Sequence, residues 1–422
     1  MPAINPNLSG IRHILRALQY RNYRLFFTGQ IISLIGTWMQ NMAMGWLVYR
    51  LTNSPVALGI IGFTSQITTF FLSPFAGAWA DRWNRRRIII ITQCLAMLQA
   101  FIFAYLALSG TIKLWHIIAL SVLFGLVMSF DMPMRQAFTV DIIDDKQDLG
   151  NAIALNSLMF NIARFAGPTI AGLVIAGFGE GICFLLNGVS YIAVIVSLFA
   201  MRMPHNAAVK DTGRIMQSMK EGIIYTFGFA PMRFIMLLMG MVSLIVMPYA
   251  VLLPVFARDV LRGNAQTLGF LMGASGLGAV SGAVYLASMK STKGLGGIIA
   301  GAGVIMGIGL IAFSLSTVLW LSLLLMFFIG FGVMVHMASS NTLLQTIVDD
   351  DKRGRVMGLF IMAFIGLAPF GSLLEGALAA RIGTPNTLLI SGIICLAGAI
   401  VFIRRLKHFN AVTAAGSRLT EI

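Results

Sequence analysis

The eleven residues Gly77–Arg87, "GAWADRWNRRR", decide the fold of this chain. Five of them are charged, whereas only 11% of the whole chain is charged. An apolar run, "SQITTFFLSPF", precedes the segment, and a longer one, "IIIITQCLAMLQAFIFAYLAL", follows it. A short charged segment between two apolar runs predicts a loop at a membrane surface.

The composition extends this interpretation to the whole chain. The 422 residues are 58% hydrophobic, and the mean hydropathy is +0.87. Soluble globular proteins are roughly 45–50% apolar and about 25% charged. Because a membrane helix needs about 20 apolar residues, the sequence predicts an all-α membrane protein with twelve transmembrane helices. The predicted spans are 25–50, 56–80, 88–109, 114–134, 151–177, 181–201, 233–256, 266–289, 296–314, 317–345, 356–380 and 386–403.

The positions of lysine and arginine predict the orientation. With the N-terminus in the cytosol, 24 of the 30 basic residues fall on the cytosolic side and five on the outer side. Positive charge gathers in cytosolic loops, so we expect both termini in the cytosol of a cell whose cytoplasmic (inner) membrane holds the chain. The net charge of +15 is spread over short loops and indicates no nucleic-acid partner.

The chain divides into two related halves. The segment "IIDDKQDLGNA" begins at Ile142, and the similar "IVDDDKRGRVMG" begins 205 residues later at Ile347. Such duplication is typical of secondary transporters. We expect a cytosolic tail (1–24), a six-helix bundle (25–201), a cytosolic linker with an amphipathic helix (202–232), a second, pseudo-symmetric bundle (233–403) and a cytosolic tail (404–422).

"GAWADRWNRRR" resembles the loop signature of the major facilitator superfamily, Gly-x-x-x-Asp-Arg-x-Gly-Arg-Arg/Lys, and lies between the same two spans. Asn84 stands where the family usually has glycine, and asparagine also tolerates a left-handed turn. The stretches "RNYRLFFTGQIISLIGTWMQ", "WLVYRLTNSPVALG", "DMPMRQAF" and "NSLMFNIARFAGP" resemble the siderophore-exporter-like branch, the enterobactin exporters and transmembrane secretion effectors.

The resemblance implies a conformational latch on the cytosolic side. In the family, the loop aspartate and first arginine pair with an acid on the fourth span, which here gives Asp81, Arg82 and Asp131. A second interpretation makes Asp131 an interfacial acid paired with Arg135, one helical turn away. The full set of latch residues is Gly77, Asp81, Arg82, Arg85, Arg86, Asp131 and Arg135.

The fifth span carries a second signature. "NIARFAGPTIAGLVIAG" resembles the antiporter pattern Gly-x-x-x-Gly-Pro-x-x-Gly-Gly at Gly167, Pro168 and Gly172, with alanine at positions 163 and 171. The resemblance implies export, whereas a kinked packing helix is the plainer interpretation. Arg164 is a basic residue deep within a span, which marks a functional site. It binds an anionic substrate, pairs with an acid, or braces the bundle.

Other polar residues within spans are candidates for binding substrate or protons. Glu375 lies far inside an apolar run and either carries a proton or reaches Arg381, two turns away. His336 either titrates or is a hydrogen-bonded packing residue. The remaining candidates are Gln40, Asn41 and Asn341.

Several classes of protein are excluded by what the sequence lacks. The chain has no phosphate loop of the form GxxxxGK[ST], and no catalytic or metal-binding constellation appears. We therefore expect no enzyme, cofactor or metal site. The sequence favours a monomeric, proton-coupled exporter of a small amphipathic or anionic compound that works by alternating access in the lipid bilayer. The alternatives are a facilitated importer or lysophospholipid translocator of the same fold, and a non-transporting membrane sensor.

Overall fold

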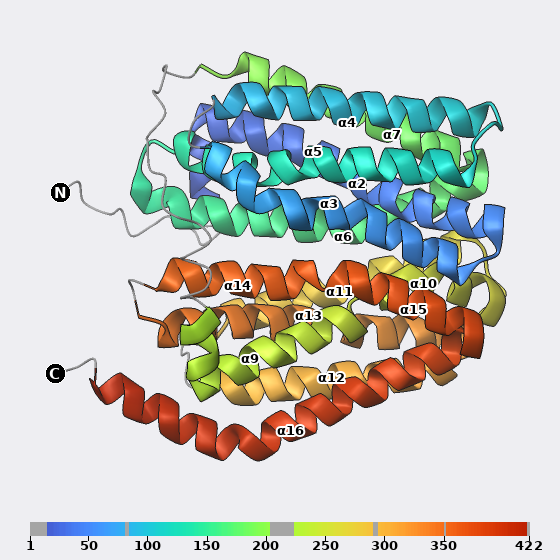
Figure 1. Cartoon of the computed structure of the whole chain (residues 1–422). Helices are drawn as coiled ribbons and strands as arrows, with labels where there is room; N and C mark the ends of the chain where they lie inside the picture. Colours follow the sequence, from blue (N-terminus) through green and yellow to red (C-terminus); the bar gives the residue numbers. More distant parts are fainter. Residues whose placement is uncertain (1–14, 81–83, 203–222, 290–293, 350–351, 420–422) are drawn as a thin grey trace.

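The computed structural model describes residues 15–80, 84–202, 223–289, 294–349 and 352–419, and this part of the chain is helical without a strand. Twelve helical stretches are long and apolar enough to cross a membrane. This result confirms the twelve predicted spans. Figure 1 shows the helices in two groups side by side, with the start of α2 and the end of α16 at the same end of the molecule.

The first group, here called the N-terminal bundle, contains six spans. A short 3₁₀-helix, η1 (Arg16–Gln19), leads into it, and η2 (Lys146–Asp148) precedes its fifth span. The spans are α2 (Arg21–Thr52), α3 (Pro55–Ala80), α4 (Arg85–Leu108), α5 (Leu114–Asp141), α6 (Leu149–Phe178) and α7 (Glu180–Ala200).

The second group, the C-terminal bundle, also contains six spans, two of which are interrupted. The seventh span comprises α9 (Ala230–Met241), η3 (Val242–Val246), α10 (Tyr249–Val255) and η4 (Phe256–Val260), where η3 and η4 are π-helices. The others are α11 (Ala265–Ala287), α12 (Leu295–Leu315), α13 (Leu319–Ile347), α14 (Arg353–Gly366) with α15 (Ala368–Ile382), and α16 (Thr384–Leu419).

Proline has different effects in the two bundles. Pro168 lies inside the continuous helix α6, whereas the corresponding span of the C-terminal bundle breaks at Leu367, two residues before Pro369. A proline in the first turn of a helix loses no hydrogen bond, because the first N–H groups are unpaired in any case. The break therefore turns Pro369 from a helix-interior residue into a helix-starting one.

Each span runs between two faces of the molecule. We call the face where α2 begins and α16 ends the terminal side and the opposite face the distal side (Figure 1). α2 ends on the distal side, and α3 begins there at Pro55. The predicted linker, 202–232, falls mostly outside the described residues; residues 223–228 near its end are helical.

Two helix pairs bring the bundles into close contact, α6 with α11 and α3 with α15. At the first, a methyl group on Gly269 would lie 2.6 Å from the carbonyl oxygen of Pro168 and 3.0 Å from the Cα of Gly172. At the second, a methyl group on Gly376 would lie 2.7 Å from the carbonyl oxygen of Pro55 and 3.0 Å from the Cα of Gly59. Both contacts lie in the distal half of their helices, and we call them the glycine seams.

The repeat is also visible on the terminal side. Tyr20 and Tyr225 are separated by 205 residues, the same offset as the two acidic loops. The hydroxyl of Tyr20 donates to Asp148 at 2.7 Å, and that of Tyr225 donates to Asp349 at 2.8 Å. The first bond raises the pKa of the Tyr20 phenol, because the neighbouring carboxylate favours the protonated donor. A tyrosine thus ties the start of each bundle to the loop before its fifth span.

We expect Gly376→Val to hold α3 and α15 apart, because a side chain at this position meets backbone atoms that cannot move aside. Ser372 is buried in the same seam. In purified protein whose natural cysteines are replaced by serine, Ser372→Cys should be protected from a hydrophilic maleimide. Adding Gly376→Val should make it reactive. Gly297→Val is the control, since nothing lies within 4 Å of that position; equal protection in both proteins would contradict a tight seam.

We expect Asp148→Asn to lower the melting temperature more than Asp349→Asn. Asp148 is 2% exposed and accepts from Arg16, Gln19 and Tyr20. The Asp349 side chain is 52% exposed, with Tyr225 and Lys352 as partners. Hydrogen bonds to charged groups contribute about 1.5–3 kcal/mol each when they are shielded from water. Equal losses in the two variants, measured by thermal unfolding in detergent, would argue against this ranking.

Candidate functional site

Helix α6 contacts both bundles through different faces. Gly167 packs against α2, since a methyl group there would lie 2.9 Å from the carbonyl oxygen of Ile35. Gly172 packs against α11 of the other bundle, where the carbonyl oxygen of Ala265 would lie at the same distance. The predicted antiporter-like residues therefore have two positions. Gly167 packs within the N-terminal bundle, whereas Pro168 and Gly172 lie in the seam between the bundles.

Arg164 lies between these two faces of α6. It is three residues from Gly167 and four from Pro168, so it shares the side of the helix that turns from α2 toward α11. Its side chain is half-buried and has no hydrogen-bond or ion-pair partner within the described part of the chain. An unpaired cation within a span is costly. The sequence suggested two structural explanations, an acidic partner or a bracing carbonyl. The described structure shows no contact of Arg164 that supports either of them.

The neighbouring face of α2 is also turned toward the C-terminal bundle. Gly45 approaches Pro254 of α10, and Asn41 lies one helical turn earlier on the same face, half-buried. Trp38, a further turn away, packs edge-to-face on Phe160 of α6 with ring centroids 5.7 Å apart. Arg164 is one turn beyond Phe160. A cation, two aromatic rings and an amide thus occupy adjacent positions on α2 and α6.

Gln40 has a structural position instead. It is 2% exposed, donates to Gln99 of α4 at 3.1 Å and accepts from Asn187 of α7 at 2.9 Å. Gln99 donates in turn to the carbonyl oxygen of Leu120 on α5 at 3.3 Å. Buried polar groups are costly unless they are hydrogen-bonded. This network links four helices of the N-terminal bundle and engages both polar atoms of the Gln40 amide.

Asp131 lies in a buried polar cluster of the same bundle. Its side chain is fully buried and accepts from Thr92 at 2.7 Å and from Gln93 at 2.8 Å, both on α4. It also pairs with Arg135, whose second amino group donates to Gln30 of α2 at 2.8 Å. The pairing of Asp131 with Arg135, the second of the two sequence interpretations, is therefore present. Asp81 and Arg82 lie outside the described residues.

The arginines that follow the loop contact their own bundle. Arg85 pairs with Asp141 at the end of α5 at 2.8 Å, and Arg86 donates to the carbonyl oxygen of Phe199 on α7 at 3.3 Å. Gly77 lies within α3. The expected left-handed turn at Asn84 is wrong: Asn84 has an extended backbone with φ −67°. It caps α4 by accepting from the N–H of Arg87 at 3.1 Å, a role that asparagine fills better than glycine.

Two candidates on α13 lie in different surroundings. His336 is 1% exposed, with Nδ1 3.5 Å from the carbonyl oxygen of Ile299 on α12, and Nε2 has no partner among the described residues. It therefore packs between two helices of one bundle. Asn341 is half-buried and accepts a hydrogen bond from Gln345, one turn away on the same helix.

Glu375 is buried inside the C-terminal bundle at 2% exposure. One carboxyl oxygen accepts from Ser391 of α16 at 2.5 Å, and the other has no partner within the described residues. Arg381, its proposed partner from the sequence, is exposed, and the structure shows no ion pair between them. Glu375 is adjacent to Gly376, so this carboxyl group lies directly behind the α3–α15 seam.

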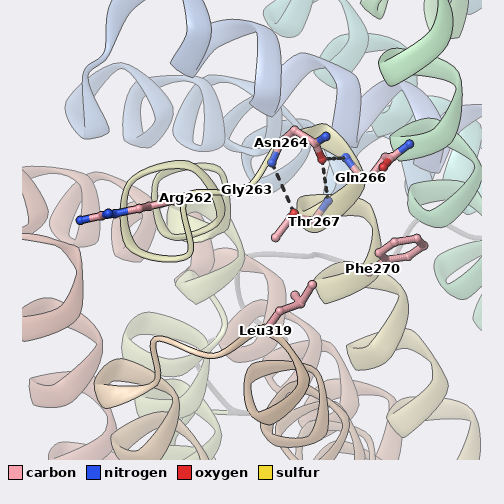
Figure 2. Close-up of a pocket in the computed structure, with 7 residues that line it drawn as sticks. All are labelled: Arg262, Gly263, Asn264, Gln266, Thr267, Phe270 and Leu319. Carbon is pink, nitrogen blue, oxygen red and sulfur yellow. Dashed lines mark hydrogen bonds between the residues drawn. The ribbon is translucent and has the colours of Figure 1, made fainter.

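A shallow pocket of about 350 Å³ lies on the distal side at the start of α11. It contains none of the candidate residues. Figure 2 shows Asn264 capping the helix through hydrogen bonds to Gln266 and Thr267, with Arg262 pointing away from them. The helix start is thus already satisfied by its own chain. No group of three potential metal ligands occurs in the described part of the protein.

Sequence reasoning missed the residues that join the bundles. Gly59, Gly269 and Gly376 lie in glycine-rich spans that lack a distinguishing signature. The available signal was the repeat offset, because Gly172 and Gly376 are 204 residues apart. The structure also joins Tyr49 and Asn53, at the end of α2, to Asp259 and Arg258 of the seventh span, and no sequence motif indicated these contacts.

Comparison with known proteins agrees with this architecture. The family model described as "transmembrane secretion effector" matches residues 14–420. The staphyloferrin A transporter of Staphylococcus aureus is 27% identical over 389 residues, which cover 90% of this chain and 96% of the relative. The multidrug efflux pump Tap of Mycolicibacterium fortuitum is 25% identical over 380 residues, or 87% of this chain and 92% of the pump.

Among solved structures, an inward-facing bacterial homologue of the human lysosomal transporter Spinster has the same fold. Its TM-score is 0.70 at 13% identity, and the match covers 93% of this chain and 98% of that one. Span number, arrangement of helices and family match all lead to the same conclusion. The chain is a multi-pass membrane transporter of the major facilitator superfamily and belongs to the transmembrane secretion effector family.

Proposed function

We propose that this transporter exports a small amphipathic or anionic compound by alternating access, coupled to proton entry. The observation that carries the proposal is Arg164, a half-buried cation within a span that has no partner among the described residues. Both the cost of such a charge and its place between the bundles are explained if an anionic group of the substrate pairs with it.

The surroundings of Arg164 support a substrate with an apolar part. A guanidinium group binds a carboxylate with two parallel hydrogen bonds. Trp38 and Phe160 provide an aromatic surface one turn away, and Asn41 provides an amide. A compound that joins a carboxylate to an apolar body fits these side chains better than an inorganic anion does.

Export is supported by α6 and by the relatives. The partial antiporter signature coincides with the seam, where Pro168 and Gly172 touch α11. The relatives include a multidrug efflux pump and a staphyloferrin A transporter. The distribution of lysine and arginine supports a cytosolic terminal side and an outer distal side in a cytoplasmic membrane. Asp81, Arg82, Asp131 and Arg135 belong to the proposed cytosolic latch.

Glu375 is the proposed proton carrier. Burying a charged carboxylate without a cation is costly, and Ser391 is its one hydrogen-bond partner in the described structure. A carboxyl group in this position gains or loses a proton according to its access to water. Its place behind the α3–α15 seam ties that access to the separation of the bundles. The proposed source of energy is the proton gradient, and no cofactor is proposed.

We expect Arg164→Gln to abolish uptake of an anionic probe by inside-out proteoliposomes, because the substitution removes the charge and the bidentate donor. The anionic probes are citrate and staphyloferrin A. Ethidium is included as an organic cation. Loss of a charged contact should reduce anion uptake at least about tenfold. Arg164→Lys should be intermediate. Arg262→Gln, at an exposed arginine, is the control, and anion uptake that survives Arg164→Gln would refute the assignment.

We expect Glu375→Gln to uncouple transport from the proton gradient. The amide keeps the shape of the side chain and its contact with Ser391 but cannot carry a proton. Uptake driven by an imposed pH gradient should vanish, whereas exchange of probe at equal pH should continue. Glu180→Gln is the matched control, since Glu180 is paired with Arg50 in the other bundle. Gradient-driven uptake by Glu375→Gln protein would exclude this residue as the carrier.

A further inference from the structure

Two residues at the distal end of α2 contact the seventh span of the other bundle. The hydroxyl of Tyr49 donates a hydrogen bond to the carboxylate of Asp259. The side-chain oxygen of Asn53 accepts from the guanidinium of Arg258 at 2.7 Å, and that guanidinium also lies 5.6 Å from the centre of the Tyr49 ring. We call these four residues the distal clasp.

The backbone of α2 fixes its two members of the clasp. Asn53 ends the helix in the left-handed conformation, with φ 49°, and its N–H donates to the carbonyl oxygen of Tyr49 at 2.8 Å. Asparagine is one of the few residues other than glycine that adopt this conformation readily. Because Tyr49 and Asn53 are four residues apart, their side chains lie on one face of the helix end.

A π-helix presents the other two members. η4 spans Phe256–Val260, and the wide turn closes with the N–H of Leu261 donating to the carbonyl oxygen of Phe256 at 3.0 Å. In this turn the consecutive residues Arg258 and Asp259 both contact α2. π-Helical turns are rare and are frequently found at functional sites. Here the turn gives one short segment two polar contacts with the opposite bundle.

The distal clasp crosses between bundles, whereas a neighbouring ion pair does not. Arg50, next to Tyr49, pairs with Glu180 of α7 at 2.9 Å, inside the N-terminal bundle. Separation of the bundles on the distal side therefore breaks the contacts of Tyr49 and Asn53 but leaves the contact of Arg50 intact. Arg258 and Asp259 are exposed, so water can replace their partners and the clasp can open without leaving a buried charge unpaired.

We propose that Tyr49, Asn53, Arg258 and Asp259 hold the distal gate of the transport path closed, and that each transport cycle breaks and remakes their contacts. The inference rests on the alternating access of the proposed function. The glycine seams supply the closely fitted walls of the closed gate, and the clasp supplies the polar contacts that set how long it stays closed. The four side chains act as positioning residues, since they hold bundles rather than substrate.

The first test measures opening without any substrate. In protein that carries Ser372→Cys as its single cysteine, a hydrophilic maleimide reports separation of the α3–α15 seam. Tyr49→Phe retains the ring and its packing and removes the donor to Asp259. Labelling should become about fivefold faster, which corresponds to the loss of one hydrogen bond. Asp259→Asn should act in the same direction, and Glu180→Gln should leave the rate unchanged.

The second test closes the gate permanently. Cysteines at positions 53 and 258 are joined with a flexible bis-methanethiosulfonate reagent, and those at positions 50 and 180 are joined in a control protein. Exchange of citrate or ethidium should stop in the first protein, continue in the control, and return after reduction.

Unchanged labelling in both Tyr49→Phe and Asp259→Asn proteins, or full exchange while positions 53 and 258 are joined, would overturn the distal clasp. A failure of the proposed export has a different result, because labelling would still accelerate in the variants even if neither probe were transported or the proton gradient had no effect.

Discussion

The structure depends on backbone contact between its two bundles. α6 meets α11, and α3 meets α15, at glycines that leave no room for a methyl group. Contacts of this closeness gain dispersion energy without hydrogen bonds to break, which suits the separation of bundles that the proposed alternating access requires. The half-buried Arg164, the carboxyl group of Glu375 and the distal clasp all lie beside these contacts. A small change in the seam therefore reaches each of them.

The bundles are internally held in a different way. Gln40, Gln99 and Asn187 form a buried hydrogen-bond network, and Asp131 with Arg135 forms a second one. Breaking such networks leaves buried polar groups unpaired, which is expensive in a membrane. The N-terminal bundle is thus held together by buried polar networks, whereas its contacts with the C-terminal bundle at the seams are made by glycines. This difference is compatible with the rigid-body motion that the proposed alternating access requires.

Much of the fold could be predicted from the sequence because its determinants are local. A run of about 20 apolar residues predicts a span wherever it occurs. The candidate site was harder to predict from the sequence. Gln40 and Asn41 are adjacent in sequence and equally polar, yet one is consumed by a network and the other faces the opposite bundle. Asn84 tolerates a left-handed turn but caps a helix instead. Such differences depend on which helices become neighbours, and local patterns in the sequence do not show those neighbours.

We propose that the bundles rock as rigid bodies around the seams. Double electron–electron resonance tests it most directly, with spin-label pairs at positions 56 and 382 on the distal side and at 153 and 284 on the terminal side, all of which are exposed. As citrate is added or the pH is lowered, we predict that the distal distance lengthens while the terminal distance shortens. Two distances that stay fixed, or that lengthen together, would contradict the account.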